Sequence, residues 1–184
     1  MKRSGLVILI FIYVIFILTI ILMGCSSDKN ETKPMNGSVV VKLTDAPVNY
    51  NRVNIEILSV KICYADKMKW VALETKKGIY NLLDFQNGLS VMLANATQIP
   101  TGRINGICLE TGNWNSVEID HVNYPVMLDE SRKGKIHIPV EARIVSGLTT
   151  SFIFDFDAKK SLRSAGTKEF ILNPVIEVKQ VQYQ

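Results

Sequence analysis

Hydrophobic and polar residues alternate along most of this chain, and the alternation limits its fold more than any other feature. Val39, Val41 and Leu43 fall on one side of an extended segment, with Ser38 and Lys42 on the other. Successive side chains of a strand point to opposite faces of a sheet, so this period of two predicts a half-buried strand. The pattern returns along the rest of the chain, with turn residues between segments, and predicts a fold built of strands.

One of these segments is long and changes its hydrophobic face. Val53–Tyr64 does so near Ile57 and Leu58, which predicts a bulge or a strand that crosses between sheets. A short helix or turn is expected only at Leu89–Ala94. About eight or nine strands and no long amphipathic helix favour an all-β, antiparallel Greek-key β-sandwich over a parallel sheet.

The first residues form a segment of a different kind. Lys2 and Arg3 precede the uncharged run Leu6–Met23, and Gly24 and Cys25 follow it. This order resembles a bacterial lipoprotein signal peptide, which implies cleavage between Gly24 and Cys25 and lipidation, with palmitate, of the cysteine. The alternative is an uncleaved transmembrane helix, because about eighteen uncharged residues suffice to span a bilayer. Under either interpretation the folded part lies outside the cytoplasm.

These features divide the chain into a signal peptide at 1–24, a lipidated flexible tether at 25–36 and a β-sandwich domain at 37–184. Stable anchoring takes two or more acyl chains, which a mature lipoprotein carries.

The formal charge is +4, and removing Lys2 and Arg3 leaves 19 basic and 17 acidic residues. So small an excess does not predict binding to nucleic acid. The charges of Arg132, Lys133 and Lys135 are interpreted as those of a solvated loop.

Two cysteines remain once Cys25 is assigned to the lipid. Cys63 and Cys108 both lie in predicted strands. They could form a disulfide if they share a sheet face on neighbouring strands; the alternative is two small, half-buried thiols. His121 is expected in a hairpin turn and His137 on the solvent face of a strand. No cysteine or histidine spacing is typical of a metal site.

Four aspartates stand out because they lie at predicted strand ends or turns: Asp45, Asp84, Asp155 and Asp157. Calcium binds six to eight oxygen ligands, often from such carboxylates, so these residues are candidate cation ligands. The alternative is that each one caps a turn through the local backbone.

Aromatic residues supply a second candidate site. Trp114 lies in a polar loop, and with Tyr124 and Tyr80 it could form a platform for a sugar or a peptide. The alternative is that Trp114 folds back over the edge of the sandwich. The sequence contains no nucleophile elbow, glycine-rich phosphate loop or recognisable catalytic set. We therefore expect no enzymatic activity and no cofactor.

Five short motifs occur in order along the folded part: Leu43–Pro47, Asn81–Asp84 with Asn87–Gly88, Ile99–Gly102, Asp155–Ser161 and Leu172–Ile176. Together they resemble the domain of unknown function 4382 family, found in bacterial lipoproteins. The resemblance covers essentially Gly37–Val181. It implies an exported β-sandwich, transthyretin-like or immunoglobulin-like, and it brings no established activity and no catalytic residues.

The sequence thus favours a non-enzymatic lipoprotein of the cell envelope, used for binding, adhesion or scaffolding. Its lipid would attach it to a membrane, the outer membrane in a Gram-negative cell, and an envelope protein or a glycan would be its partner. Sheet edges and loops can recruit such partners. The alternative is a glycan- or calcium-binding module of an envelope uptake system.

Overall fold

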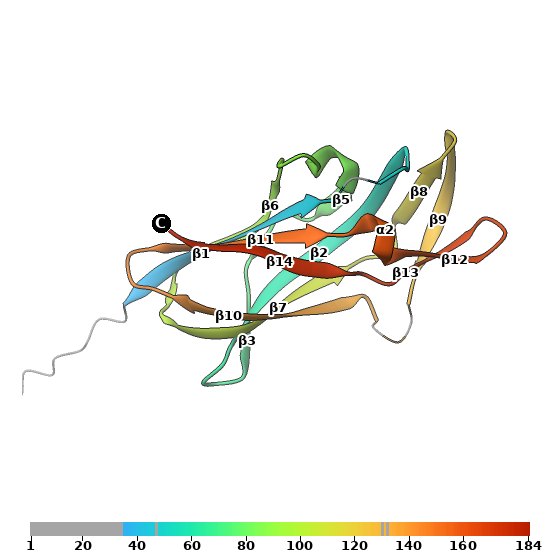
Figure 1. The fold of residues 1–184 in the computed structure, drawn as a ribbon. Coiled ribbons are helices and arrows are strands. Elements are labelled where there is room, and N and C mark those ends of the chain that lie inside the picture. The colour runs from blue at the N-terminus through green and yellow to red at the C-terminus, as the bar shows by residue number, and fades with distance from the viewer. Residues whose placement is uncertain (1–34, 47, 130, 132) are drawn as a thin grey trace, which may run out of the picture. The chain divides into compact units, whose positions relative to one another are not determined.

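Fourteen β-strands and two short helical turns make up the computed structural model, which describes residues 35–46, 48–129, 131 and 133–184 (Figure 1). The predicted signal peptide, its cleavage site, the lipidation site Cys25 and most of the tether lie outside the described residues. Within them, no helix has the length and hydrophobicity needed to cross a bilayer.

The strands form two sheets. In spatial order, the five-stranded sheet contains β14 (Ile176–Tyr183), β11 (Thr149–Phe156), β1 (Asn36–Asp45), β6 (Val91–Pro100) and β4 (Glu74–Thr75). The main path of the nine-stranded sheet is β10 (Lys135–Ile144), β7 (Gly102–Thr111), β2 (Arg52–Tyr64), β8 (Asn115–Ile119), β9 (Val122–Leu128), β13 (Glu169–Leu172) and β12 (Leu162–Gly166). The remaining strands β3 (Lys69–Ala72) and β5 (Gly78–Asn81) pair with β2, and the helical turns are η1 (Leu82–Phe85) and α2 (Ala158–Ser161).

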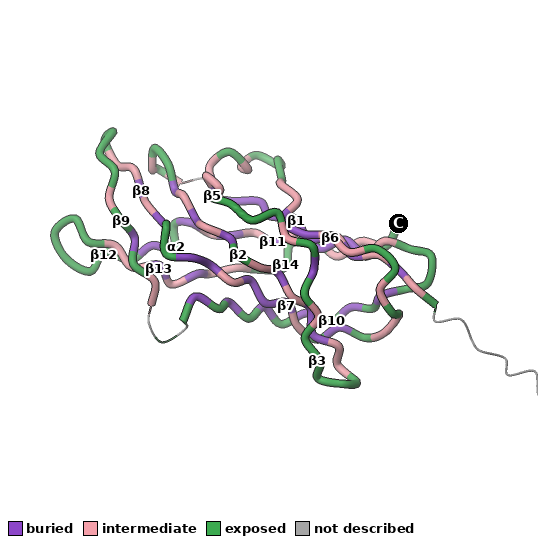
Figure 2. Tube along the Cα trace, turned by 180° about the vertical axis from the view of Figure 1, so that it is seen from behind, coloured by how far each residue is buried: buried purple, intermediate pink, exposed green. Residues whose placement is uncertain are grey.

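One hydrophobic core lies between the two sheets. Val39, Val41 and Leu43 of β1 are fully buried, as the alternation predicts. On the neighbouring strand β11, Phe152 pairs in register with Val41, and Phe154 pairs with Leu43. The same alternation of buried and exposed positions is visible along β10 (Figure 2). The expectation of an all-β fold is confirmed.

The sheets are mixed, so the expectation of purely antiparallel sheets is wrong. β1 pairs with β11 in parallel, and β9 pairs with β13 in parallel. Parallel neighbours need a long connection, and a large part of the chain separates β1 from β11. The hydrophobic alternation within a strand has the same period in either direction, so it carries no information about this choice.

The bulge expected in the long segment is present in β2. Its register with β7 shifts between Ile57 and Ser59. The residue between them, Leu58, is exposed, whereas Ile57 and Val60 are buried. The extra residue turns the polar side of the second half of β2 to the outer face of the sheet.

The predicted helix at Leu89–Ala94 is wrong. Most of that segment belongs to β6, which pairs with β1 on one side and β4 on the other. Leu89, which precedes β6, is 62% exposed. Leucine, methionine and alanine favour helices when isolated, but pairing with two strands decides the conformation here. The count of eight or nine strands is also too low, since short strands such as β4, β12 and β13 carry little alternation.

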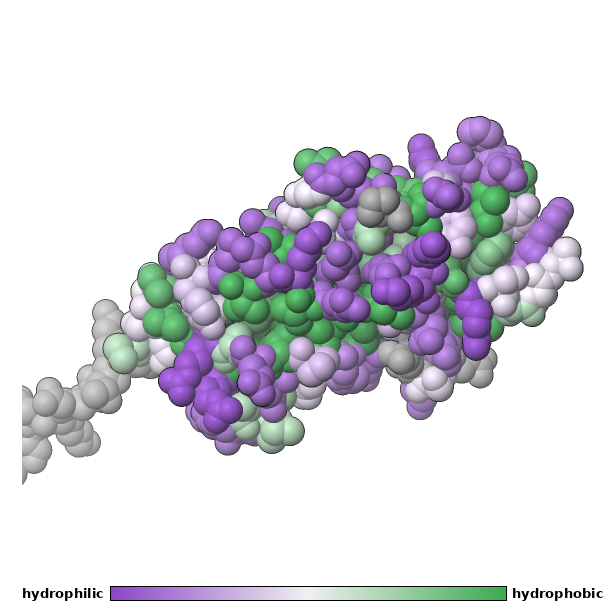
Figure 3. All heavy atoms as spheres, viewed as in Figure 1, coloured by the Kyte–Doolittle hydropathy of each residue, from purple (hydrophilic) through white to green (hydrophobic). Residues whose placement is uncertain are grey.

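β10 and β14, which end the main paths of their sheets, lie next to each other at one side of the domain. The backbone N–H of Arg143 in β10 donates a hydrogen bond to the hydroxyl of Tyr183 in β14. Hydrophobic residues gather across the middle of the visible face, over these two strands (Figure 3). The two edge strands thus lie side by side without backbone pairing between them in the described structure.

Candidate functional site

The first pair of candidate cation ligands is engaged with the protein itself. Asp45 is 3% exposed, and its two carboxylate oxygens accept hydrogen bonds from the backbone N–H of Ala158 and the side-chain amide of Gln86, each at 3.1 Å. Burial raises the pKa of Asp45 above its usual value, although these hydrogen bonds oppose the shift. Asp84 accepts a hydrogen bond from the Asn81 amide at 2.8 Å.

The other pair, Asp155 and Asp157, forms ion pairs. Lys179 Nζ lies 3.6 Å from Asp155, and Lys160 Nζ lies 2.8 Å from Asp157. Asp157 also caps α2 by accepting the backbone N–H of Lys160. Burial opposes ionisation of Asp157, but the bonds to Lys160 lower its pKa overall. Throughout the described ranges, no three histidine, cysteine, aspartate or glutamate side chains are arranged to hold a metal ion.

Four of the five sequence motifs meet at one end of the domain. The Thr44 hydroxyl donates a hydrogen bond to the Phe85 carbonyl at 2.7 Å, next to the Asp45–Gln86 contact. The backbone N–H of Val175 donates to the Ser161 hydroxyl at 2.9 Å. Asp45 links these two contacts through the first residue of α2. The motifs therefore hold strand ends together, which is a structural role.

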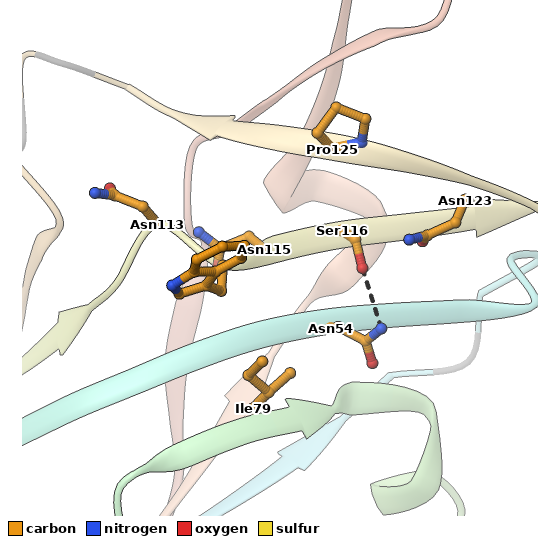
Figure 4. A pocket seen from close by; sticks show the side chains of 8 residues that line it. Asn54, Ile79, Asn113, Asn115, Ser116, Asn123 and Pro125 are labelled. Carbon is orange, nitrogen blue, oxygen red and sulfur yellow. Dashed lines mark hydrogen bonds between the residues drawn. The ribbon is translucent and has the colours of Figure 1, made fainter.

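A hollow of about 410 Å³ lies on the outer face of the nine-stranded sheet (Figure 4). Residues of β2, β5, β8 and β9 and of the β7–β8 loop line it: Asn54, Ile79, Asn113, Trp114, Asn115, Ser116, Asn123 and Pro125. Among the described residues, the lining is apolar and amide-rich and includes no charged side chain.

Trp114 is the largest exposed hydrophobic side chain of this hollow, with 75% of its surface accessible. Ile79 beside it is 57% exposed. Across the hollow, Asn54 donates a hydrogen bond to Ser116 at 3.1 Å, drawn as a dashed line in Figure 4. Asn113 and Asn123 are exposed, so their amides are open to a ligand. An aromatic face next to amides can contact the C–H face of a sugar and its hydroxyl groups together.

The loop that presents Trp114 is held by Glu56 of β2. The Glu56 carboxylate accepts a hydrogen bond from the backbone N–H of Trp114 at 3.0 Å. The Glu56 backbone carbonyl accepts one from the backbone N–H of Gly112, also at 3.0 Å. The buried Asn115 accepts the N–H of Glu56 at 2.9 Å and donates to the Gly112 carbonyl at 2.8 Å. The backbone of this loop is thus fixed without a ligand, which reduces the entropy lost on binding.

The two tyrosines predicted to join Trp114 lie elsewhere, and this part of the platform prediction is wrong. Tyr124 packs against Phe170, with ring centroids 5.7 Å apart, and Tyr80 packs against Phe85 at 6.3 Å. Both tyrosines contact the core cluster. Their neighbours in sequence line the hollow instead, because alternate residues of a strand face opposite sides.

Most residues that line the hollow could not be identified from the sequence. Asn54, Ile79 and Asn123 come from separate strands and belong to no motif. The available signal was the cluster of asparagines around Trp114, at Asn113 and Asn115. Only the pairing of β2 with β5 and β8, and of β8 with β9, places the other residues beside this cluster.

Cys63 and Cys108 are buried and both thiols are free in the structure. Cys63 lies opposite Gly106, whereas Cys108 lies opposite Lys61, so the two cysteines are diagonal neighbours. Such neighbours are about 7–8 Å apart, farther than a disulfide normally spans. Burial raises the pKa of the Cys108 thiol, which disfavours the reactive thiolate.

The two histidines lie where the sequence predicts them. His121 belongs to the tight turn between β8 and β9, where both Asp120 and His121 have positive φ angles. His137 is exposed on β10, and its ring contacts Trp70 edge-on at 5.4 Å. Neither residue lines the Trp114 hollow.

The comparisons with known proteins agree with the order of the sequence motifs. The family model described as domain of unknown function (DUF4382) matches residues 36–174. No curated protein and no solved structure matches the chain. The matched region runs from the first strand to the segment before β14, and the chain therefore belongs to the domain of unknown function 4382 family.

Proposed function

We propose that this chain is a lipoprotein of the cell envelope whose β-domain binds a glycan without transforming it. Lipid on Cys25 would hold the domain at a membrane, outside the cytoplasm. Recognition of a glycan would then serve adhesion or scaffolding at the cell surface. The observation that carries the proposal is the exposed Trp114 on a pre-formed loop beside an amide-lined hollow.

The chemistry of the hollow favours a sugar. Ligand sites combine hydrophobic contact with a few polar groups that fix orientation. Trp114 and Ile79 supply the contact surface, and the amides of Asn113 and Asn123 both donate and accept hydrogen bonds. An uncharged lining matches hydroxyl-rich ligands, because burial of an ionic group beside it would lack compensation.

The same lining supports a binding role over a catalytic one. General acid–base and nucleophilic catalysis need titratable or nucleophilic groups near the reacting atoms. The hollow is lined by asparagine, isoleucine, tryptophan, serine and proline, and its Ser116 accepts a hydrogen bond from Asn54. Calcium is a weaker candidate, since each of the four aspartates already bonds protein groups.

We also propose that the two sheets are the layers of a Greek-key sandwich of the transthyretin-like or immunoglobulin-like class. Two sheets around one hydrophobic core support this assignment. A fold class assigned to this domain must also contain a parallel strand pair like that of β1 and β11. An experimental structure, compared with both classes, tests it.

Replacement of Trp114 tests the glycan proposal. We expect Trp114→Ala to weaken binding by tenfold or more, because an exposed aromatic anchor typically contributes over ~1.4 kcal/mol. Trp114→Phe should keep part of the affinity. The measurement is isothermal titration of the full-length protein, in a detergent without a sugar headgroup, against a panel of oligosaccharides.

Tyr183→Ala is the matched control, since Tyr183 is an exposed aromatic residue on the other sheet. It should leave glycan affinity unchanged, and thermal denaturation should show that both variants remain folded. Equal binding by Trp114→Ala and the native protein would contradict the proposal, as would a panel with no ligand. New reducing ends after incubation with a bound glycan would contradict the non-enzymatic role.

A further inference from the structure

The Trp114 hollow is the first of three connected hollows on the outer face of the nine-stranded sheet. A second hollow, of about 850 Å³, shares Asn113 and Pro125 with it. A third, of about 350 Å³, shares Lys133 with the second. We name this series the outer track. Its continuity suits an elongated ligand better than a single sugar.

The bulge in β2 and the outer side of β9 shape the middle of the outer track. Leu58, the bulged residue, is 38% exposed there, and Met127 is 53% exposed. Glu110 lies in the same hollow, but its carboxylate accepts a hydrogen bond from Ser59 at 2.8 Å and pairs with Lys61 at 3.4 Å. These contacts lower the pKa of Glu110 and satisfy its charge.

Two lysines lie at the far end of the outer track, and two carboxylates, Glu110 and Asp129, line the second hollow beside them. Among the residues that the structure describes, Ser131, Lys133, Lys135 and His137 line the third hollow, and two of these four are lysines. Lys135 lies opposite Glu110 of β7, and the Glu110 carboxylate also pairs with Lys61 at 3.4 Å. The first hollow, in contrast, has an uncharged lining. The two ends therefore differ in the chemical groups that they recognise.

The length of the outer track follows from the register of the strands. Lys135 of β10 lies opposite Glu110 of β7, four residues before Trp114 in the sequence. The first and third hollows share no lining residue, and the second hollow lies between them. A ligand that contacts both ends must therefore be longer than a single sugar unit.

We propose that the ligand is an acidic oligosaccharide, with one unit on Trp114 and a carboxylate, sulfate or phosphate several units away at Lys133 and Lys135. This inference rests on the proposed glycan-binding function and names its ligand class. Charge complementarity selects the acidic chain, and exposed charges of this kind act in a salt-dependent manner.

Pairs of oligosaccharides that differ only in charge test the inference. The probes are hexagalacturonate and a hyaluronan hexasaccharide, each with its fully methyl-esterified form. Full-length protein should bind the acidic member of a pair about tenfold more tightly at low salt, since two exposed ion pairs contribute about 1.4 kcal/mol together. The difference should shrink at high salt.

The double variant Lys133→Gln, Lys135→Gln should bind the acidic and esterified members equally. The matched control is Lys159→Gln, Lys168→Gln, which removes two exposed lysines outside the outer track and should keep the preference. Monomeric galacturonate is too short to reach the lysines from Trp114, so its affinity should be the same for native protein and the double variant.

The outcomes separate the two proposals. If Trp114→Ala abolishes binding but acidic and esterified hexamers bind native protein equally, this inference is overturned and the glycan-binding function stands. If no oligosaccharide binds, both are overturned. Binding of a glutamate hexapeptide that depends on the lysines but not on Trp114 would also overturn the inference, in favour of an acidic protein partner.

Discussion

Asp45 shows what burial does to one carboxylate in this protein. It lies at the end of β1 and joins the N-terminus of α2 to Gln86. Burial is the main reason for its raised pKa, and the nearby carboxylate of Asp155 adds to the shift. The ionised form is therefore less favourable in the folded state than in the unfolded chain.

This shift predicts a pH dependence that Asp45→Asn removes. A raised folded-state pKa contributes stability that is fully present below the unfolded pKa, about 3.9, and is lost as pH rises through the folded pKa. The free energy of unfolding of Asp45→Asn should therefore rise relative to the native protein between pH 4 and pH 7. Urea denaturation at several pH values measures it, and a difference that does not change with pH would contradict the prediction.

At the same scale, single positions decided which aromatic residues reach the ligand site. Tyr124 lies between Asn123 and Pro125, and both of those neighbours line the Trp114 hollow. Tyr124 belongs to β9, where a shift of one residue reverses the face of the strand. The residue types near Trp114 in the sequence do not indicate on which face of β9 the side chain of Tyr124 lies.

At the scale of elements, the β7–β8 loop depends on a glycine. A Cβ on Gly112 would lie 1.8 Å from the Glu56 carboxylate, so a larger residue must displace Glu56. The same carboxylate also accepts the backbone N–H of Trp114. Displacement of Glu56 would therefore disturb both the loop and the ligand site.

Gly112→Ala should therefore lower the free energy of unfolding by about 1–2 kcal/mol, since Glu56 must move and its hydrogen bond to Trp114 is lost. It should also weaken oligosaccharide binding, because Trp114 is no longer held in place. Urea denaturation and titration calorimetry measure the two effects.

Gly78→Ala is the matched control, since no atom lies within 4 Å of a Cβ at Gly78. Its stability and affinity should stay close to those of the native protein. A Gly112→Ala protein with native stability and affinity would show that the Glu56 contact does not organise the loop.

Pairing between elements also explains the wrong helix. The segment at β6 contains helix-favouring residues, but it fills the gap between β1 and β4 and takes their extended conformation. The local preference for helix amounts to less than ~1 kcal/mol per residue, which hydrogen bonds to two neighbours outweigh.

At the scale of the whole molecule, the proposed function depends on a lipid that holds the β-domain at the envelope. Cys25 is the predicted site, and Cys63 and Cys108 are buried in the folded part. Only one of the three cysteines is therefore expected to carry acyl chains.

Cys25→Ala should abolish incorporation of labelled palmitate and remove the mature protein from the membrane fraction. The physical reason is that a lipoprotein of this kind has no membrane attachment other than its acyl chains. Cys63→Ala is the control and should keep both labelling and membrane association. Persistent labelling of the Cys25→Ala protein would place the modification at another residue.

The all-β class, the buried face of β1, the bulge in β2, the turn at His121 and the family could all be predicted from the sequence. Each of these follows from local alternation, turn residues or motif order, which neighbours along the chain already contain. The parallel β1–β11 pairing, the strand at β6 and the set of residues around Trp114 became visible in the folded structure. The reason is that strand partners and register depend on contacts between distant segments, whereas alternation specifies only which face of each strand is buried.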